Sequence, residues 1–282
     1  GSAGGIGTVF AANSLQVQLP HVGVYKVLLV SSFFLQVAGQ RSLNEGPTCS
    51  HERGAMSKCI PWVHKMRSMC QLHNCTSTLH AAAGEGCGAP AKAADKGWGG
   101  QVGPTTRWSC LFPARSLRSI RAPTFVINSA VDSWQLVNVW RRFYRCRYDG
   151  TTGCTPVQVA HAVAQTNGMI DRFTDDLRAS GALTTPGHGA FITPCNEHVA
   201  GMSANGFKYY RIGNHTMRTA LGRWWAASQS APAADHTWLS CRLTAESGKD
   251  RPHHQCNPSC LKHHVKRRLS QECSCDPGKD TK

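Results

Sequence analysis

The run from Ala122 to Ala130 is the feature that most limits how this chain can fold. It is a compact β-prone segment that contains Pro123 near its start and is closely followed by Asp132. Such a run suits a strand that is buried on both faces, as strands are in a parallel sheet covered by helices. We therefore expect an α/β protein with a mostly parallel sheet and flanking helices.

Other segments alternate between helical and extended patterns along the chain. The helical patterns cover residues 6–19, 156–180 and 216–227, and the extended ones cover residues 22–30 and 190–192. We predict one α/β domain over residues 1–228, with an Ala/Gly-rich insertion at 81–107 that has few large apolar side chains to bury. Residues 229–282 are Cys/His-rich and basic, and we predict a separate tail there.

Fourteen cysteines at irregular spacing favour disulfides and an oxidising compartment. The glycosylation sequons at Asn74 and Asn214 agree with a secreted, extracellular or cell-wall location. No signal peptide is visible, and the chain opens on motif-like residues instead of Met, so we expect the N-terminus of the protein to be missing. No run of eighteen apolar residues occurs, and we expect no membrane span.

The chain carries 31 basic and 16 acidic residues, a formal net charge of +15. Such a surface attracts polyanions, although a solubilising surface with a basic tail explains the same charge. The basic residues are scattered, apart from the stretch 262–268. Neither zinc-finger spacing nor an aromatic-basic RNA motif occurs, and we predict no nucleic-acid partner.

The residues Gly1-Ser2-Ala3-Gly4-Gly5 fit the turn that presents a nucleophilic serine, where small neighbours let the backbone approach itself closely. A flexible linker would have the same small residues. A serine needs a base, and the base needs an orienting acid. Asp132 and His198 follow predicted strands in the order Ser, Asp, His of α/β hydrolases. As alternatives, Asp132 could cap a following helix, and His198 could be a surface histidine.

The segment from Pro123 to Gln135, with its Asp-Ser-Trp-Gln ending, resembles the pectin acetylesterase family, whose superfamily also contains the animal Notum esterases. Further similar segments occur in the same order along the chain: Ser2–Gly5, Asn74–Ser77, Cys110–Pro113, Gly189–His198, Arg223–Trp224 and Cys256–Cys260. Together they cover roughly residues 1–260, which is far more specific than any single motif.

The resemblance implies an α/β-hydrolase-like fold that lacks its first strands and the upstream Gly-rich oxyanion loop. It implies Ser2 as the nucleophile, Asp132 as the acid, His198 as the base and the Ala3 N–H as an oxyanion-hole donor, with no cofactor and no metal. The expected function is a serine carboxylesterase that deacetylates a cell-wall polysaccharide such as pectin through an acyl-enzyme. We expect a monomer whose partner is an acetylated acidic polysaccharide, and we expect the fragment to need the missing segments for activity.

The sequence departs from the family where Ser31-Ser32-Phe33-Phe34 stands, because the family usually carries an Asp there. By resemblance, Cys75 and Cys110 form a disulfide and Cys195 is also bridged. A rival interpretation of the tail is a zinc site, built from the cluster His253, His254, Cys256, Cys260, His263 and His264.

Two other functions remain open. A Notum-like enzyme would remove a lipid from a protein and would need a deep apolar pocket. A catalytically inactive homologue would bind a polyanion or carbohydrate outside the cell, in keeping with the truncated start and the altered Ser31 position.

Overall fold

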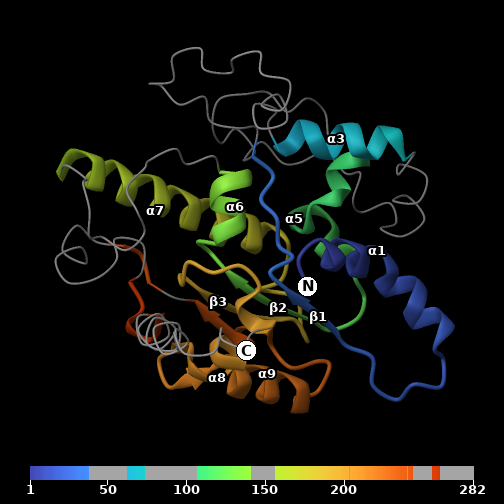
Figure 1. The fold of residues 1–282 in the computed structure, drawn as a ribbon. Helices are drawn as coiled ribbons and strands as arrows, with labels where there is room; N and C mark the ends of the chain where they lie inside the picture. The colour runs from blue at the N-terminus through green and yellow to red at the C-terminus, as the bar shows by residue number, and fades with distance from the viewer. Residues whose placement is uncertain are drawn as a thin grey trace, which may run out of the picture.

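A four-stranded parallel sheet forms the centre of the computed structural model (Figure 1). The structure describes residues 1–37, 62–73, 107–140, 156–202, 204–239, 241–243 and 256–260. The strands lie in chain order across the sheet and pair in parallel: β1 (Val27–Val30), β2 (Thr124–Ser129), β3 (Gly189–Thr193) and β6 (Thr237–Leu239).

Helices cover both faces of the sheet, so that the protein has three layers (Figure 1). One face carries α1 (Ala3–Gln18), α5 (Pro113–Ser116), α6 (Ser133–Asn138) and α7 (Pro156–Ala179), and the other carries α8 (Ala204–Tyr209) and α9 (Met217–Ala226). The other elements in the described part of the chain are α3 (Trp62–Leu72), the hairpin β4 (Arg211–Ile212) and β5 (His215–Thr216), and the 3₁₀ helices η3 (Arg107–Leu111), η4 (Leu117–Ser119), η5 (Ala200–Met202) and η6 (Ala233–His236).

Alternating side chains of β2 supply both cores. Val126 packs with the residues of α1 and α7, whereas Phe125 and Ile127 pack against α9. All six residues of β2 are buried, as expected for a strand covered on both faces. The prediction of a mostly parallel α/β sheet is therefore confirmed.

The strongest patterns in the sequence correspond to elements of the structure. The predicted strands at 122–130 and 190–192 are β2 and β3, and the predicted helices at 6–19, 156–180 and 216–227 are α1, α7 and α9. Thr216 caps α9, where its hydroxyl accepts the N–H of Thr219 at 3.1 Å.

Three elements differ from the predictions. The strand expected over 22–30 spans Val27–Val30 alone, and Val22 and Val24 are exposed. Helix α3 lies in a polar, cysteine-rich region for which no helix was predicted. Strand β6 extends the sheet beyond residue 228, the predicted end of the α/β domain. Of the insertion predicted at 81–107, residues 81–106 lie outside the described residues, and Arg107 begins η3.

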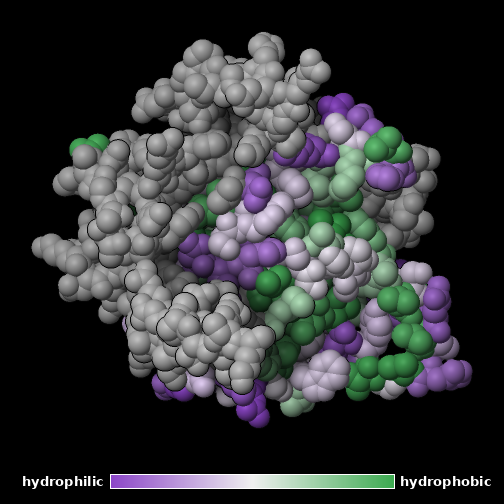
Figure 2. All heavy atoms as spheres, in the orientation of Figure 1, coloured by the Kyte–Doolittle hydropathy of each residue, from purple (hydrophilic) through white to green (hydrophobic). Residues whose placement is uncertain are grey.

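Exposed apolar side chains gather on one part of the surface (Figure 2). They come from the second half of α1 and the segment that leads to β1: Leu15, Val17, Leu19, Val22 and Val24. Within the described ranges, none of the helices combines the length and hydropathy needed to cross a bilayer.

Candidate active site

Ser2, Asp132 and His198 come together at the carboxyl edge of the sheet. Asp132 follows β2, His198 follows β3, and Ser2 directly precedes α1. The carboxyl ends of parallel strands meet at one edge, so these residues, distant in sequence, become neighbours.

The Ser2 hydroxyl lies at the start of the hydrogen-bonded chain. Its Oγ is 2.8 Å from Nε2 of His198. The backbone of Ser2 has φ 51° and ψ −137°, a strained combination that is uncommon for residues other than glycine. The Ser2 N–H donates to the carbonyl oxygen of Val30 at 2.9 Å, which fixes the turn against the end of β1.

Asp132 makes two sets of hydrogen bonds, one with each carboxylate oxygen. Oδ2 lies 2.7 Å from Nδ1 of His198. Oδ1 accepts the backbone N–H groups of Trp134 and Gln135 at 3.0 and 2.9 Å, so it also caps α6. One fully buried carboxylate therefore both contacts His198 and caps the helix, so the two interpretations of this residue do not exclude each other.

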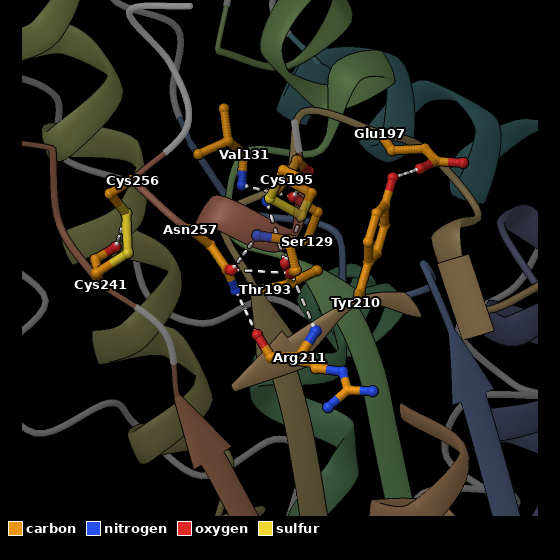
Figure 3. The surroundings of a disulfide bond; sticks show 12 residues. Ser129, Val131, Thr193, Cys195, Glu197, Tyr210, Arg211, Cys241, Cys256 and Asn257 are labelled. Carbon is orange, nitrogen blue, oxygen red and sulfur yellow. Dashed lines mark hydrogen bonds between the residues drawn. A yellow bond between two sulfur atoms is a disulfide. The ribbon is translucent and has the colours of Figure 1, made fainter. Parts of the chain in front are cut away.

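The loop that carries His198 is fixed before the histidine by three contacts, shown in Figure 3. The Ser129 hydroxyl donates to the carbonyl oxygen of Cys195. Cys195 forms a disulfide with Cys260, and the Tyr210 hydroxyl donates to the carboxylate of Glu197. The sequence did not single out Ser129 or Tyr210, because their partners are 66 and 13 residues away and no local pattern marks them.

Aromatic rings lie beside the His198 imidazole. The ring of Trp134 is 6.1 Å from it between centroids, at an interplanar angle of 33°. Trp134 in turn contacts Phe34 and Trp62 edge to face, at 5.5 and 5.3 Å. These three rings, which we call the aromatic cluster, give the site an apolar flank.

Gln135 holds the chain that brings Phe34 to this flank. Its side-chain amide accepts the N–H of Leu35 at 2.9 Å and donates to the carbonyl oxygen of Phe33 at 3.0 Å. Both hydrogen bonds are buried, so the strand-to-loop transition after β1 is fixed relative to α6. Gln135 belongs to the Asp-Ser-Trp-Gln motif, but the sequence alone predicts no role for it.

The four described cysteines that follow β3 form two disulfides. Cys195 is bridged, as the resemblance implied, and a second disulfide joins Cys241 to Cys256. The zinc interpretation is wrong for Cys256 and Cys260, since a bridged cysteine offers no thiolate. The four histidines of that cluster lie outside the described residues.

The predicted disulfide between Cys75 and Cys110 is described only in part. Cys110 is disulfide-bonded, as is Cys70, while Cys75 lies outside the described residues, so the predicted pair of Cys75 and Cys110 stays a prediction. Among the residues with described positions, no group of three or more His, Cys, Asp or Glu side chains is arranged to hold a metal ion.

The structure describes one of the two predicted glycosylation sites. Asn214 is exposed at the turn of the β4–β5 hairpin, beside Gly213 with φ 57°. Asn74 lies outside the described residues. A glycan on Asn214 would therefore extend from the surface without displacing the core.

Comparisons with known proteins agree with this architecture. Pectin acetylesterases 7 and 11 of Arabidopsis thaliana are each 30% identical to the chain over 146 residues, which is 48% of this chain and 36% of each of those proteins. The structure of the Wnt deacylase Notum from Drosophila matches with a TM-score of 0.51 at 17% identity, over 92% of this chain and 57% of that one. That likeness supports the α/β-hydrolase-like fold.

The chain thus spans about a third of the curated relatives and somewhat more than half of the structural neighbour. A model of the family described as Pectinacetylesterase matches residues 1–246 of the 282 in this chain. With the family motifs joined in one site and most of the chain matched, this protein belongs to the pectinacetylesterase family.

Proposed function

We propose that the protein is a serine carboxylesterase that works through an acyl-enzyme. The observation that supports this most strongly is the continuous hydrogen-bonded chain from Ser2 Oγ through His198 to Asp132, at 2.8 and 2.7 Å. In such a chain the imidazole takes the proton of the hydroxyl as the oxygen attacks, and the carboxylate orients and stabilises the imidazolium.

The proposed reaction has two halves. Ser2 Oγ attacks the ester carbonyl carbon, and His198 passes the proton to the departing alcohol as the carbon–oxygen bond breaks. Water then attacks the acyl-serine, His198 takes its proton, and the acid leaves as Ser2 regains its hydrogen.

Ala3 is the proposed backbone donor to the oxyanion. It is the first residue of α1, where N–H groups have no acceptor within the helix. The positive end of the helix dipole also favours a developing negative charge there.

The proposed substrate is an acetyl ester on an acidic polysaccharide. The relatives are pectin acetylesterases by name, and the formal net charge of +15 would attract a polyanionic chain. Disulfides and the exposed Asn214 sequon support a secreted protein that acts outside the cell or in the cell wall.

A second candidate is deacylation of a lipidated protein. The Notum structure is titled a Wnt deacylase, and the aromatic cluster beside His198 offers apolar surface to an acyl chain. The rates of hydrolysis of p-nitrophenyl acetate and of a long-chain p-nitrophenyl ester distinguish the two: the acetylesterase proposal predicts faster turnover of the acetate.

The test of the mechanism is labelling with a fluorophosphonate probe that reacts with activated serines. The wild-type protein should label, Ser2→Ala should not, and His198→Ala should label roughly 10⁴-fold more slowly. Matched controls are Ser14→Ala and His21→Ala, since both side chains lie on exposed positions away from the triad.

A folded wild-type protein that takes up no probe would refute the esterase proposal and leave a polyanion-binding homologue as the better account. Equal labelling of wild type and Ser2→Ala would move the nucleophile elsewhere.

A further inference from the structure

Backbone strain in the described residues concentrates around the triad. Three residues other than glycine have positive φ: Ser2 at 51°, Ser31 at 46° and Val199 at 55°. Valine is rarely found in this region because its branched side chain crowds the backbone. Ser2 carries the triad hydroxyl, Val199 directly follows His198, and Ser31 directly follows β1. Such strained residues persist where the surrounding contacts hold them.

Residues 30–32 contact both halves of the site, and we call them the 30–32 bridge. The Val30 carbonyl oxygen accepts the N–H of Ser2 at 2.9 Å. The next residue, Ser31, accepts the N–H of Val199 on its Oγ at 2.8 Å. The backbone beside the serine and the backbone beside the histidine are therefore tied to consecutive residues.

The 30–32 bridge is itself firmly placed. The Ser31 N–H continues the sheet by donating to the carbonyl oxygen of Ile127 at 2.8 Å, and the Ser32 hydroxyl donates to the carbonyl oxygen of Val30 at 2.8 Å. The side chains of Ser31 and Ser32 are both fully buried. A displacement of this bridge would therefore require rearrangement of the sheet edge.

The contact of Ser31 is distinct from the other anchors of the histidine loop. The contacts to Cys195 and Glu197 hold the chain before His198, and the contact from Ser31 holds it one residue after. Without the Ser31 hydroxyl, the N–H of Val199 loses its acceptor and the strained residue is less restrained.

From this geometry we infer that Ser31 is a positioning residue, whose hydroxyl sets the separation between Ser2 Oγ and His198 Nε2. It acts through the backbone of Val199 and does not touch the substrate. The inference rests on the proposed esterase function, and it assigns a role to the position at which the sequence departs from the family pattern.

The test compares Ser31→Ala with Ser180→Ala. Ser180 is a matched control, because its buried hydroxyl also accepts a backbone N–H, that of Ala182 at 3.2 Å, at the end of α7. Ser31→Ala should lower kcat for p-nitrophenyl acetate roughly 100-fold, as expected for a misplaced catalytic pair, with KM within about twofold of wild type. Ser180→Ala should leave both constants within about twofold, whatever it does to the melting temperature.

Ser31→Gly separates the hydrogen bond from the backbone strain. Glycine adopts φ 46° freely, so it removes the hydroxyl while relieving the strain. If the hydroxyl is what positions the histidine, kcat of Ser31→Gly should be as low as kcat of Ser31→Ala. The glycine variant also replaces Ser31→Ala in the test if that protein does not fold. A Ser31→Gly enzyme with wild-type kcat would overturn the inference.

A crystal structure of either Ser31 variant tests the positioning independently of activity. The separation of Ser2 Oγ and His198 Nε2 should exceed hydrogen-bonding distance, and a separation that stays at 2.8 Å would overturn the inference. If the wild-type protein neither labels nor turns over ester, the proposed function fails, and this distance alone decides the role of Ser31.

Discussion

The Asp132 carboxylate serves two partners at once. Oδ2 faces the imidazole of His198, and Oδ1 accepts two backbone N–H groups at the start of α6. The carboxylate is completely buried, so each oxygen needs these partners to offset its desolvation. Replacements that keep one function and lose the other can therefore separate catalysis from stability.

Asp132→Asn should lose activity with a small effect on stability. An amide oxygen can still cap α6, but its NH₂ group faces His198 and favours the wrong tautomer of the imidazole. We expect kcat to fall about 10⁴-fold, measured with p-nitrophenyl acetate. Asp132→Ala should lose the same activity and in addition about 1–2 kcal/mol of unfolding free energy, measured by urea denaturation.

Thr216→Ala is the control for the cap alone, since Thr216 caps α9 without contacting the triad. It should reduce stability by about 1 kcal/mol and leave kcat unchanged. A fully active Asp132→Asn enzyme would contradict the assignment of this carboxylate as the orienting acid.

The proximity of Ser2, Asp132 and His198 could be predicted from sequence, because each belongs to a recognisable motif or follows a strand, in the order typical of α/β hydrolases. The contact between Ser31 and Val199 could not, since it joins residues 168 positions apart. Only the fold brings them together, and neither residue type marks the contact.

At the scale of elements, α1 packs closely against the end of β1 at one glycine. A Cβ atom on Gly5 would lie 1.8 Å from the Ser32 Oγ, whereas a Cβ on Gly4 or Gly7 would meet nothing within 4 Å. Gly5 therefore permits the approach of the helix to the 30–32 bridge, and the other two glycines are not required for it.

Gly5→Ala and Gly7→Ala should consequently change stability in opposite directions. Gly7→Ala should raise the unfolding free energy by about 0.5–1 kcal/mol, since alanine is favoured in helices. Gly5→Ala should lower it by about 1–3 kcal/mol through overpacking, and should slow probe labelling because Ser32 must move. Thermal or urea unfolding measures the stability of both variants. A Gly5→Ala protein that is more stable than wild type would contradict the close contact between Gly5 and Ser32.

Long periodic patterns predicted their elements, and short or polar ones did not. Helix α7 and strand β2 bury a clear set of apolar residues, so the spacing of those residues in the sequence predicts both elements. Strand β6 has three residues, too few to show a period. Helix α3 does bury Val63, Met66 and Cys70 at helical spacing, but this short pattern lies within a polar, cysteine-rich region and was not recognised there. The strand pattern at Val22 and Val24 failed because those side chains are exposed outside the sheet.

For the whole molecule, two buried histidines link stability to pH. His188 and His236 lie next to the first residues of β3 and β6, at the end of the sheet opposite the triad. Burial lowers the pKa of His188, against an opposing effect from the Pro186 backbone. Burial also lowers the pKa of His236, with Asp235 opposing and Arg223 and Lys26 reinforcing the shift.

A lowered pKa in the folded state means that the unfolded chain binds more protons on acidification. The stabilisation by the neutral histidines is complete above the unfolded pKa of about 6.5, and it decreases as the pH falls toward the folded pKa. We expect the urea midpoint to drop between pH 7 and pH 5, with a shallower drop in His188→Asn. The exposed His21→Asn should follow the wild-type curve, and an identical slope in His188→Asn would refute the linkage.

The two C-terminal disulfides are nested, since Cys241–Cys256 lies within the interval closed by Cys195–Cys260. A protease that cuts a single peptide bond between residues 196 and 259 would therefore leave one covalent molecule. Such a nicked chain keeps its apparent size until a reductant is added, and its histidine loop stays attached at Cys195. For a protein proposed to act outside the cell, this arrangement gives tolerance to cleavage that the hydrophobic core alone would not provide.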